Sequence, residues 1–210
     1  MKKRVLYILL VVMLAFQANA DSFIAPPPIS FTNTTPYTYN GSNIGTSPGY
    51  TQNSCFGTGV TITYFVISST LSYSGFGPPI YAGSYRMEVR IDGGPCNAQI
   101  FSTSFIINKS LISITSVTNT KNYDGTITAS GLPTITSGSL GTGDVGTFKE
   151  EYDTKNQGTG KTLTPSVVSI VDGSGIDMTG NYTVTPVQTT NGIINKSLIS
   201  ITSVTNTKNY

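Results

Sequence analysis

The same eighteen residues, IINKSLISITSVTNTKNY, occupy positions 106–123 and return at positions 193–210. The two copies are offset by 87 residues. Solenoid and propeller repeats have periods of about 20 to 50 residues, whereas one small β-sandwich needs roughly 100 residues. The repeat therefore predicts a tandem array of β-sandwich modules.

Weaker matches extend the repeat upstream and set the predicted boundaries. ISFTNTTPYTYNG (29–41) resembles ISITSVTNTKNYDG (112–125), and AGSYRMEV (82–89) parallels TGNYTVTP (179–186). We predict a leader at 1–20, a first module at 21–109, a second at 110–196 and the first strand of a third at 197–210. That last strand lacks the rest of its module, so we expect it to be unpaired or poorly ordered, and we expect the protein to continue past Tyr210.

The first twenty residues have the layout of a secretory signal peptide. A basic start at Lys2–Arg4 precedes the apolar run VLYILLVVMLAF, and the small residues of ANA end at Ala20. We predict cleavage after Ala20 and a secreted or cell-surface location. An uncleaved anchor is the alternative, but it needs about 20 apolar residues. We expect no transmembrane segment in the mature chain.

Charge and composition narrow the class of protein. The chain has 12 basic and 10 acidic residues, three of the basic ones lying in the leader, so the mature chain keeps nine basic and ten acidic residues. This balance gives no basic surface for nucleic acid. Frequent Thr, Ser, Tyr, Val, Gly and Asn favour short strands and tight turns.

Alternating side chains mark two strands in the first module. Tyr85, Met87, Val89 and Ile91 alternate with charged residues, which predicts one buried and one wet face. In VTITY (60–64), we expect Val60, Ile62 and Tyr64 to point inward.

Turns and tyrosines recur at related places in the two modules. Gly41 in YNG and Gly125 in YDG predict turns with a positive φ. Tyr85 and Tyr182 each begin a late strand, and we hypothesise that each hydroxyl bonds an upstream backbone group, as in a tyrosine corner.

The motifs YDGT, GTGKT, GNYTV and INK occur in that order within residues 121–197. Through them this stretch resembles the YDG-type repeat of large bacterial surface proteins. The first module is similar to the related MBG-type immunoglobulin-like domain, through YTYNG, VTITY, PIYAGSYRMEVRI and FIINK. The resemblance implies an all-β fold of tandem immunoglobulin-like β-sandwich modules in adhesin-like or haemagglutinin-like proteins. It implies a stalk or spacer role and brings no catalytic residues.

Two cysteines lie in the first module, and an exported protein meets an oxidising environment. Cys55 precedes the VTITY strand and Cys96 follows the SYRMEVRI strand. If those strands run antiparallel, their cysteine-bearing ends meet, so we predict a Cys55–Cys96 disulfide. Two free thiols are the alternative.

Three other patterns are weighed as sites and set aside. GTGKT (158–162) lacks the first glycine of a phosphate loop, and a strand pattern follows it. DGSGID (172–177) lacks the ligand spacing of a calcium loop, so we interpret it as a glycine-rich hairpin or loop. We interpret Glu150, Glu151 and Asp153 as a solvated strand or loop, in preference to a paired-carboxylate site.

The chain has no histidine, which excludes Ser-His and Cys-His nucleophiles within it. A two-carboxylate glycosidase is conceivable, but no cleft is indicated. We therefore expect no enzyme activity, no catalytic residue, no cofactor and no metal site.

Two functions remain open. The first is a structural spacer whose partners are neighbouring modules of the same chain. The alternative is a module array that binds surface glycans or proteins, since aromatic faces can stack on sugars. The aromatic candidates in the first module are Tyr37, Tyr39, Tyr50, Phe56, Tyr73, Phe76 and Tyr81.

Overall fold

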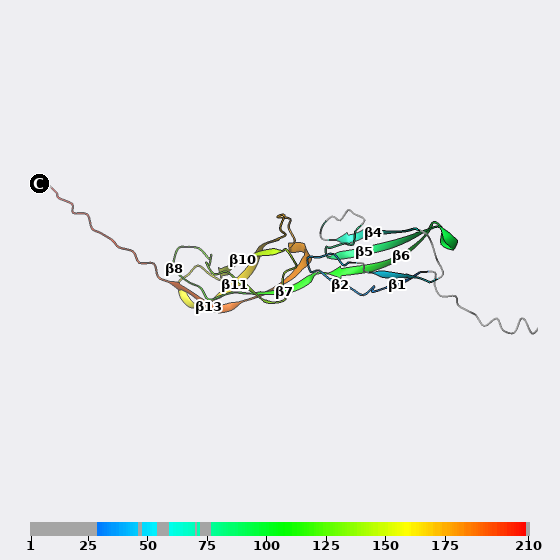
Figure 1. The fold of residues 1–210 in the computed structure, drawn as a ribbon. Helices are drawn as coiled ribbons and strands as arrows, with labels where there is room; N and C mark the ends of the chain where they lie inside the picture. Colours follow the sequence, from blue (N-terminus) through cyan, green and yellow to red (C-terminus); the bar gives the residue numbers. More distant parts are fainter. Residues whose placement is uncertain (1–28, 46–47, 54–58, 70, 72–76, 209–210) are drawn as a thin grey trace, which may run out of the picture.

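The computed structural model describes residues 29–208, except 46–47, 54–58, 70 and 72–76. This part of the chain is all-β, which confirms the predicted class. Two groups of strands follow one another along an elongated molecule (Figure 1). We refer to residues 29–109 as the N-terminal half and to residues 110–195 as the C-terminal half.

The N-terminal half contains a two-stranded and a four-stranded sheet. The small sheet pairs β1 with β3, and the larger one has the order β2-β6-β5-β4. Strand β2 runs parallel to β6, and the other neighbours are antiparallel. The elements are β1 (Ile29–Thr32), β2 (Tyr37–Thr38), β3 (Gly49–Gln52), β4 (Gly59–Ser69), β5 (Gly83–Asp92), the 3₁₀ turn η1 (Gly94–Cys96) and β6 (Gln99–Asn108).

The C-terminal half contains a three-stranded and a four-stranded sheet. Their orders are β12-β7-β9 and β10-β11-β13-β8. Strand β12 runs parallel to β7, and β13 runs parallel to β8. The elements are β7 (Ser110–Thr115), β8 (Thr120–Asn122), β9 (Thr134–Ser137), β10 (Val145–Tyr152), β11 (Gly158–Val171), η2 (Thr179–Asn181), β12 (Tyr182–Val187) and β13 (Thr189–Asn195).

The two four-stranded sheets have the same strand order and the same strand directions. Strands β4, β5, β6 and β2 correspond in order and direction to β10, β11, β13 and β8. The registers correspond too, because Gly83 faces Ile107 in one sheet and Gly158 faces Ile194 in the other.

One sequence parallel is wrong in detail. AGSYRMEV covers most of β5, whereas TGNYTVTP covers most of β12, and these strands lie in different kinds of sheet. The chain after β12 crosses at Gln188 into β13 of the four-stranded sheet, while β5 returns through η1 into β6 of its own sheet.

The alternation in β5 is confirmed, because Tyr85, Met87, Val89 and Ile91 are all buried. In β4 the expectation is only partly correct. Tyr64 is buried and Ile62 is half-buried, but Val60 remains 38% exposed. Strand β4 lies at the edge of its sheet. Among the described residues, its outer side has no neighbouring strand in that sheet, which leaves Val60 open to solvent.

One hydrophobic core runs through both halves. It includes Tyr85 and Ile107 of the N-terminal half together with Ile112 and Ile170 of the C-terminal half. A smaller cluster of Ala129, Tyr152, Leu163 and Ile194 lies further along the C-terminal half. Only Lys109 separates the end of β6 from the start of β7.

Residues 196–208 belong to no strand in the described part of the chain. Their apolar side chains are open to solvent, Leu198 being 97% exposed. Figure 1 shows this segment running away from the folded body. The same residue types form β7 and β8 when they occur at 110–122.

Candidate functional site: the contact between the two halves

The two halves meet through short loops at facing ends. The N-terminal half contributes Tyr39, the Asn40–Gly41 turn after β2, and Ala82 before β5. The C-terminal half contributes the 141–144 loop between β9 and β10, together with Asn181 and Tyr182. These residues form hydrogen bonds between segments that are distant in sequence.

Asp144 lies at the centre of this contact. Its Oδ2 accepts hydrogen bonds from the Tyr39 hydroxyl at 2.7 Å and from the Tyr182 hydroxyl at 2.5 Å. The two rings pack edge to face, with centroids 5.4 Å apart. Hydrogen bonds to an ionised acceptor are stronger than neutral ones, so one carboxylate couples a tyrosine from each half.

Burial is the main reason why the pKa values of Tyr39 and Tyr182 lie well above the ordinary tyrosine value. The hydrogen bond to Asp144 adds to the rise in both cases. The Gly141 amide, which donates to the Tyr182 hydroxyl at 2.7 Å, opposes the rise for Tyr182. Both phenols therefore stay protonated at neutral pH and act as donors to Asp144.

Backbone also meets backbone across the contact. The Thr142 amide donates to the Asn40 carbonyl oxygen at 2.7 Å. Gly41 has a φ of 79°, and a Cβ there would lie 2.4 Å from the Thr142 nitrogen. Only glycine combines this φ with this close approach.

A buried asparagine provides the third bond. The Asn181 Oδ1 accepts from the Ala82 amide at 2.9 Å, and Asn181 is completely buried. Loss of a buried partner is costly because the remaining group stays desolvated. Asn181 thus ties η2 to the start of β5.

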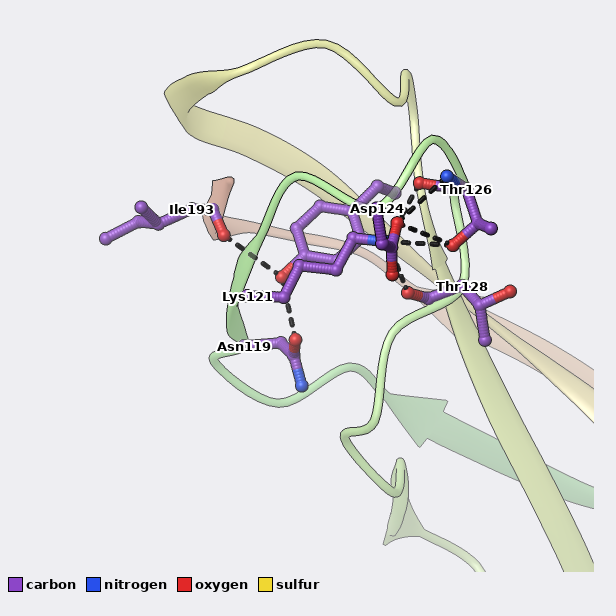
Figure 2. A network of polar contacts seen from close by, with 7 residues as sticks. Asn119, Lys121, Asp124, Thr126, Thr128 and Ile193 are labelled. Carbon is purple, nitrogen blue, oxygen red and sulfur yellow. Dashed lines mark hydrogen bonds and ion pairs between the residues drawn. The ribbon is translucent and has the colours of Figure 1, made fainter. Parts of the chain in front are cut away.

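At the other end of the C-terminal half, Lys121 holds the turn that contains Gly125. Its Nζ donates to Asp124 Oδ1 at 2.9 Å, to the Thr126 carbonyl at 2.8 Å and to the Thr128 carbonyl at 3.0 Å. Figure 2 shows these groups converging on the Lys121 side chain. The hydrogen bond from Lys121 is the main reason why the pKa of Asp124 falls to about 2, and hydrogen bonds from Thr126 lower it further.

Tyr152 contacts residues that hold the same turn. The Lys121 Nζ lies 5.4 Å from the Tyr152 ring centroid, within cation–π range. The Tyr152 hydroxyl is 2.7 Å from Asn119 Oδ1 and 3.2 Å from the Ile193 carbonyl oxygen. The contacts made by Asn119 and Ile193 are visible in Figure 2. The turn is therefore fixed from several sides.

The two tyrosines singled out from the sequence have different partners. The Tyr85 hydroxyl donates to the Tyr81 carbonyl oxygen, four residues upstream, at 2.7 Å. The Tyr182 hydroxyl instead bonds the distant Gly141 amide and Asp144. Tyr85 is thus bonded within one half, whereas Tyr182 takes part in the contact between the halves.

Gly41 and Gly125 both occupy turns with positive φ, at 79° and 81°. Their surroundings differ, because Gly41 lies against Thr142 and Gly125 has no atom within 4 Å of an added Cβ.

Of the two predicted disulfide partners, Cys96 is buried at the end of η1. Cys55 lies outside the described residues. The Cys55–Cys96 disulfide stays a prediction.

The phosphate-loop and calcium-loop patterns have local structural roles. GTGKT begins the long strand β11, where Lys161 donates to Thr154 Oγ1 at 2.6 Å. In DGSGID, Asp172 Oδ1 accepts from the Ser174 and Ile176 amides, and Asp177 Oδ1 accepts from the Thr179 amide. These carboxylates therefore stabilise turns of their own loop.

The interpretation of Glu150 as solvated is wrong. Glu150 is completely buried in β10, and its Oε2 accepts from the Val117 amide at 2.9 Å. Its Oε1 has no hydrogen-bond partner among the described residues. The alternation of β10 places Glu150 inward beneath the 116–118 segment, whereas Glu151 is half-buried and Asp153 is exposed.

The described aromatic candidates for sugar stacking are engaged with the core. Tyr39 is buried, and Tyr37, Tyr50 and Tyr81 pack against the main cluster. Phe56, Tyr73 and Phe76 lie outside the described residues.

Three comparisons with known proteins found no match. No protein-family model, curated protein or solved structure is similar enough to this chain to be recognised. The resemblance to MBG-type and YDG-type modules therefore stays a prediction. Within the described residues, no helix has the length and apolar character needed to cross a membrane. The same residues contain no group of three His, Cys, Asp or Glu side chains arranged to hold a metal.

Sequence reasoning missed the central members of the contact. Asp144, Gly141 and Asn181 were not singled out, although each has a local signal. Asp144 ends a GTGD loop in a chain with few charges, and Asn181 directly precedes the singled-out Tyr182. Nothing in those signals indicates that the partners lie in the other half.

Proposed function

We propose that this chain is a non-catalytic structural region of a secreted or cell-surface, adhesin-like repeat protein. Its two halves act as immunoglobulin-like modules, MBG-like and YDG-type, that hold other parts of the protein at a distance. The export signal at 1–20 and the exact repeat at 106–123 and 193–210 support this proposal.

The observation that carries the proposal is the joint between the halves. One residue, Lys109, links β6 to β7, and Asp144 binds Tyr39 and Tyr182 across the joint. Such a joint restricts bending, because a change of angle would separate a charge-assisted hydrogen bond from its buried partner. A region built in this way keeps its two ends at a fixed separation.

X-ray scattering from residues 21–210 provides the first test. We expect the curve of a single elongated particle with the length of the two halves end to end. A curve that requires a broad ensemble of interdomain angles would contradict a rigid spacer. N-terminal sequencing of exported protein should begin at Asp21.

Glycan-array binding by the same protein tests the alternative. We expect no glycan to be retained above background, because the described candidates Tyr37, Tyr39, Tyr50 and Tyr81 pack in or against the core. Saturable binding to one glycan class would replace the spacer proposal with a binding function.

A further inference from the structure

We propose that the free end of the C-terminal half is a docking surface for another unit with the sequence of residues 110–195. Tyr123, the Asp124–Gly125 turn and Gln157 form this surface. The inference rests on the proposed repeat array and deepens it by naming the residues that would receive the next unit.

The backbone at Tyr123 matches the backbone at Tyr39, which is already in contact with a following unit. The Tyr39 amide donates to the Asn108 carbonyl at 2.9 Å, and the Tyr123 amide donates to the Asn195 carbonyl at 2.9 Å. Each tyrosine directly follows a short strand that runs parallel to the last strand of its own half. Tyr123 therefore occupies the place of Tyr39.

The turns that follow are the same as well. Asn40 Oδ1 accepts from the Ser42 amide, and Asp124 Oδ1 accepts from the Thr126 amide, each at 2.9 Å. The glycine that follows the asparagine or aspartate has a φ of 79° at Gly41 and 81° at Gly125. The second turn thus holds the Asp124 carbonyl and Gly125 in the conformation in which the Asn40 carbonyl and Gly41 of the first turn contact Thr142.

The two turns differ in how far they are covered by a following unit. Tyr39 is 3% exposed beneath the C-terminal half, while Tyr123 is 42% exposed. A Cβ on Gly41 would collide with the Thr142 backbone, whereas one on Gly125 would meet nothing within 4 Å. The same local structure is therefore occupied at one end and open at the other.

The sequence after Asn195 identifies the occupant. Lys196 and Ser197 follow Asn195 as Lys109 and Ser110 follow Asn108, and the identity continues through the residues that form β7 and β8. A unit that begins at Ser197 would have the same one-residue link. Its copies of Gly141, Thr142 and Asp144 would then face Tyr123.

A second whole copy of the chain does not fit this surface as well. In every copy, the 141–144 loop is already in contact with Asn40 and bonded to Tyr39. An additional unit of the 110–195 type brings an uncommitted loop.

Charge does not oppose this docking. Asp124 replaces Asn40, and an incoming copy of Asp144 would bring a second carboxylate close to it. Lys121 pairs with Asp124 at 2.9 Å and is itself only 14% exposed in its side chain. The aspartate is therefore compensated within its own turn.

Gln157 supplies an independent point of contact. The matching register of Gly83 and Gly158 puts Gln157 in the place of Ala82, one residue before each strand. The Ala82 amide donates to Asn181 across the existing joint. The Gln157 amide should donate in the same way to the incoming copy of Asn181.

The test uses the full chain and the full chain followed directly by a second copy of residues 124–196. Because 197–210 repeats 110–123, this extension completes one more unit. Hydrogen exchange measured by NMR should slow at least about tenfold at the Gln157 amide when the unit is added. The added copy of Thr142 should be as protected as Thr142 itself.

Tyr123→Phe in the extended chain tests the predicted bond to the added aspartate. We expect exchange at the added Thr142 copy to rise about tenfold, the effect of losing one hydrogen bond to a charged group. Tyr210→Phe is the matched control, because it makes the same change in the sequence copy of Tyr123 at the new free end. It should leave that exchange rate unchanged.

Three results would overturn the inference. The added unit could fold, as judged by slow exchange in its copy of β11, while the Gln157 amide and the added Thr142 copy exchange as fast as open loops. The two Tyr→Phe variants could have equal effects. The added unit could also fail to fold, although the same sequence folds at 110–195. The spacer proposal would survive the first two results, since its own tests concern residues 21–210 alone.

Discussion

Tyr39 and Tyr182 come from opposite halves of the molecule and donate to the same oxygen of Asp144. A shared acceptor makes the two tyrosines depend on each other, because displacement of either ring disturbs the carboxylate that the other uses. The joint between the halves should therefore respond to single substitutions that leave each half folded.

Replacing Asp144 by Asn should lower the free energy of unfolding by about 1–3 kcal/mol, because the two hydroxyls lose their charged acceptor. Urea unfolding followed by circular dichroism measures the change. Asp153→Asn is the matched control, since Asp153 is exposed and lies 3.9 Å from its Lys161 partner. Equal effects of the two substitutions would contradict the central position of Asp144.

Tyr182→Phe should cost about 1–3 kcal/mol of stability, because the Gly141 amide and Asp144 both lose a partner. Tyr123→Phe in the unextended chain should change stability by less than about 0.5 kcal/mol, as expected for an exposed surface site. Thermal melting of both variants checks the difference. An unchanged melting temperature for Tyr182→Phe would show that its hydroxyl contributes nothing.

Alkaline pH should weaken the joint. The pKa values of Tyr39 and Tyr182 are raised in the folded protein. In the unfolded chain the pKa of a tyrosine is about 10. Their contribution to stability is complete below the unfolded pKa and is lost as the pH rises above it.

Urea unfolding at a series of pH values from neutral to strongly alkaline should show this decline. The double variant Tyr39→Phe, Tyr182→Phe should show a shallower one. Tyrosinate absorbance provides a second check. If both phenols ionised in the folded protein at the ordinary tyrosine pKa, the raised values would be refuted.

Gly131 should not tolerate alanine. A Cβ at Gly131 would lie 2.1 Å from Glu150 Oε1 and 2.7 Å from the Val117 Cγ2. Glu150 is held by the Val117 amide and is buried, so it cannot move aside freely. We expect Gly131→Ala to cost about 1–3 kcal/mol, as overpacking typically does.

Gly173→Ala is the matched control for Gly131→Ala. An added Cβ at Gly173 meets nothing within 4 Å, so stability should change little. Chemical denaturation of the two variants side by side makes the comparison. A tolerated Gly131→Ala would show that the packing around Glu150 is looser than described.

The Cys55–Cys96 disulfide should be found in protein exported through an oxidising compartment. Mass spectrometry after alkylation without reductant should find no modified thiol. Reduction should destabilise the N-terminal half by about 3–4 kcal/mol on the loop-entropy model, less any strain. Two alkylated cysteines in the unreduced protein would exclude the bond.

The sequence predicted those structural features that are determined by residues close together in the chain. Alternation placed Tyr85, Met87, Val89 and Ile91 inward, because a strand pairs each residue with a fixed face. Asn-Gly and Asp-Gly located the turns at Gly41 and Gly125, because few other residue pairs favour a positive φ.

Partners distant in sequence were not predictable in this way. Asp144 bonds residues 105 and 38 positions away, and no local pattern specifies either partner. Glu150 was misread for a related reason. A charged residue in an alternating strand is usually exposed, but here the Val117 amide from another segment donates a hydrogen bond to the buried Glu150 carboxylate.

The parallel pairing of the first two strands with the last two strands of the C-terminal half has a mechanical consequence. This half begins with β7 and ends with β13; β7 lies parallel to β12, and β8 lies parallel to β13. Tension applied between Ser110 and Asn195 therefore slides these strands past each other along their length. Rupture under such a load must break several ladder bonds together, instead of peeling them apart one at a time.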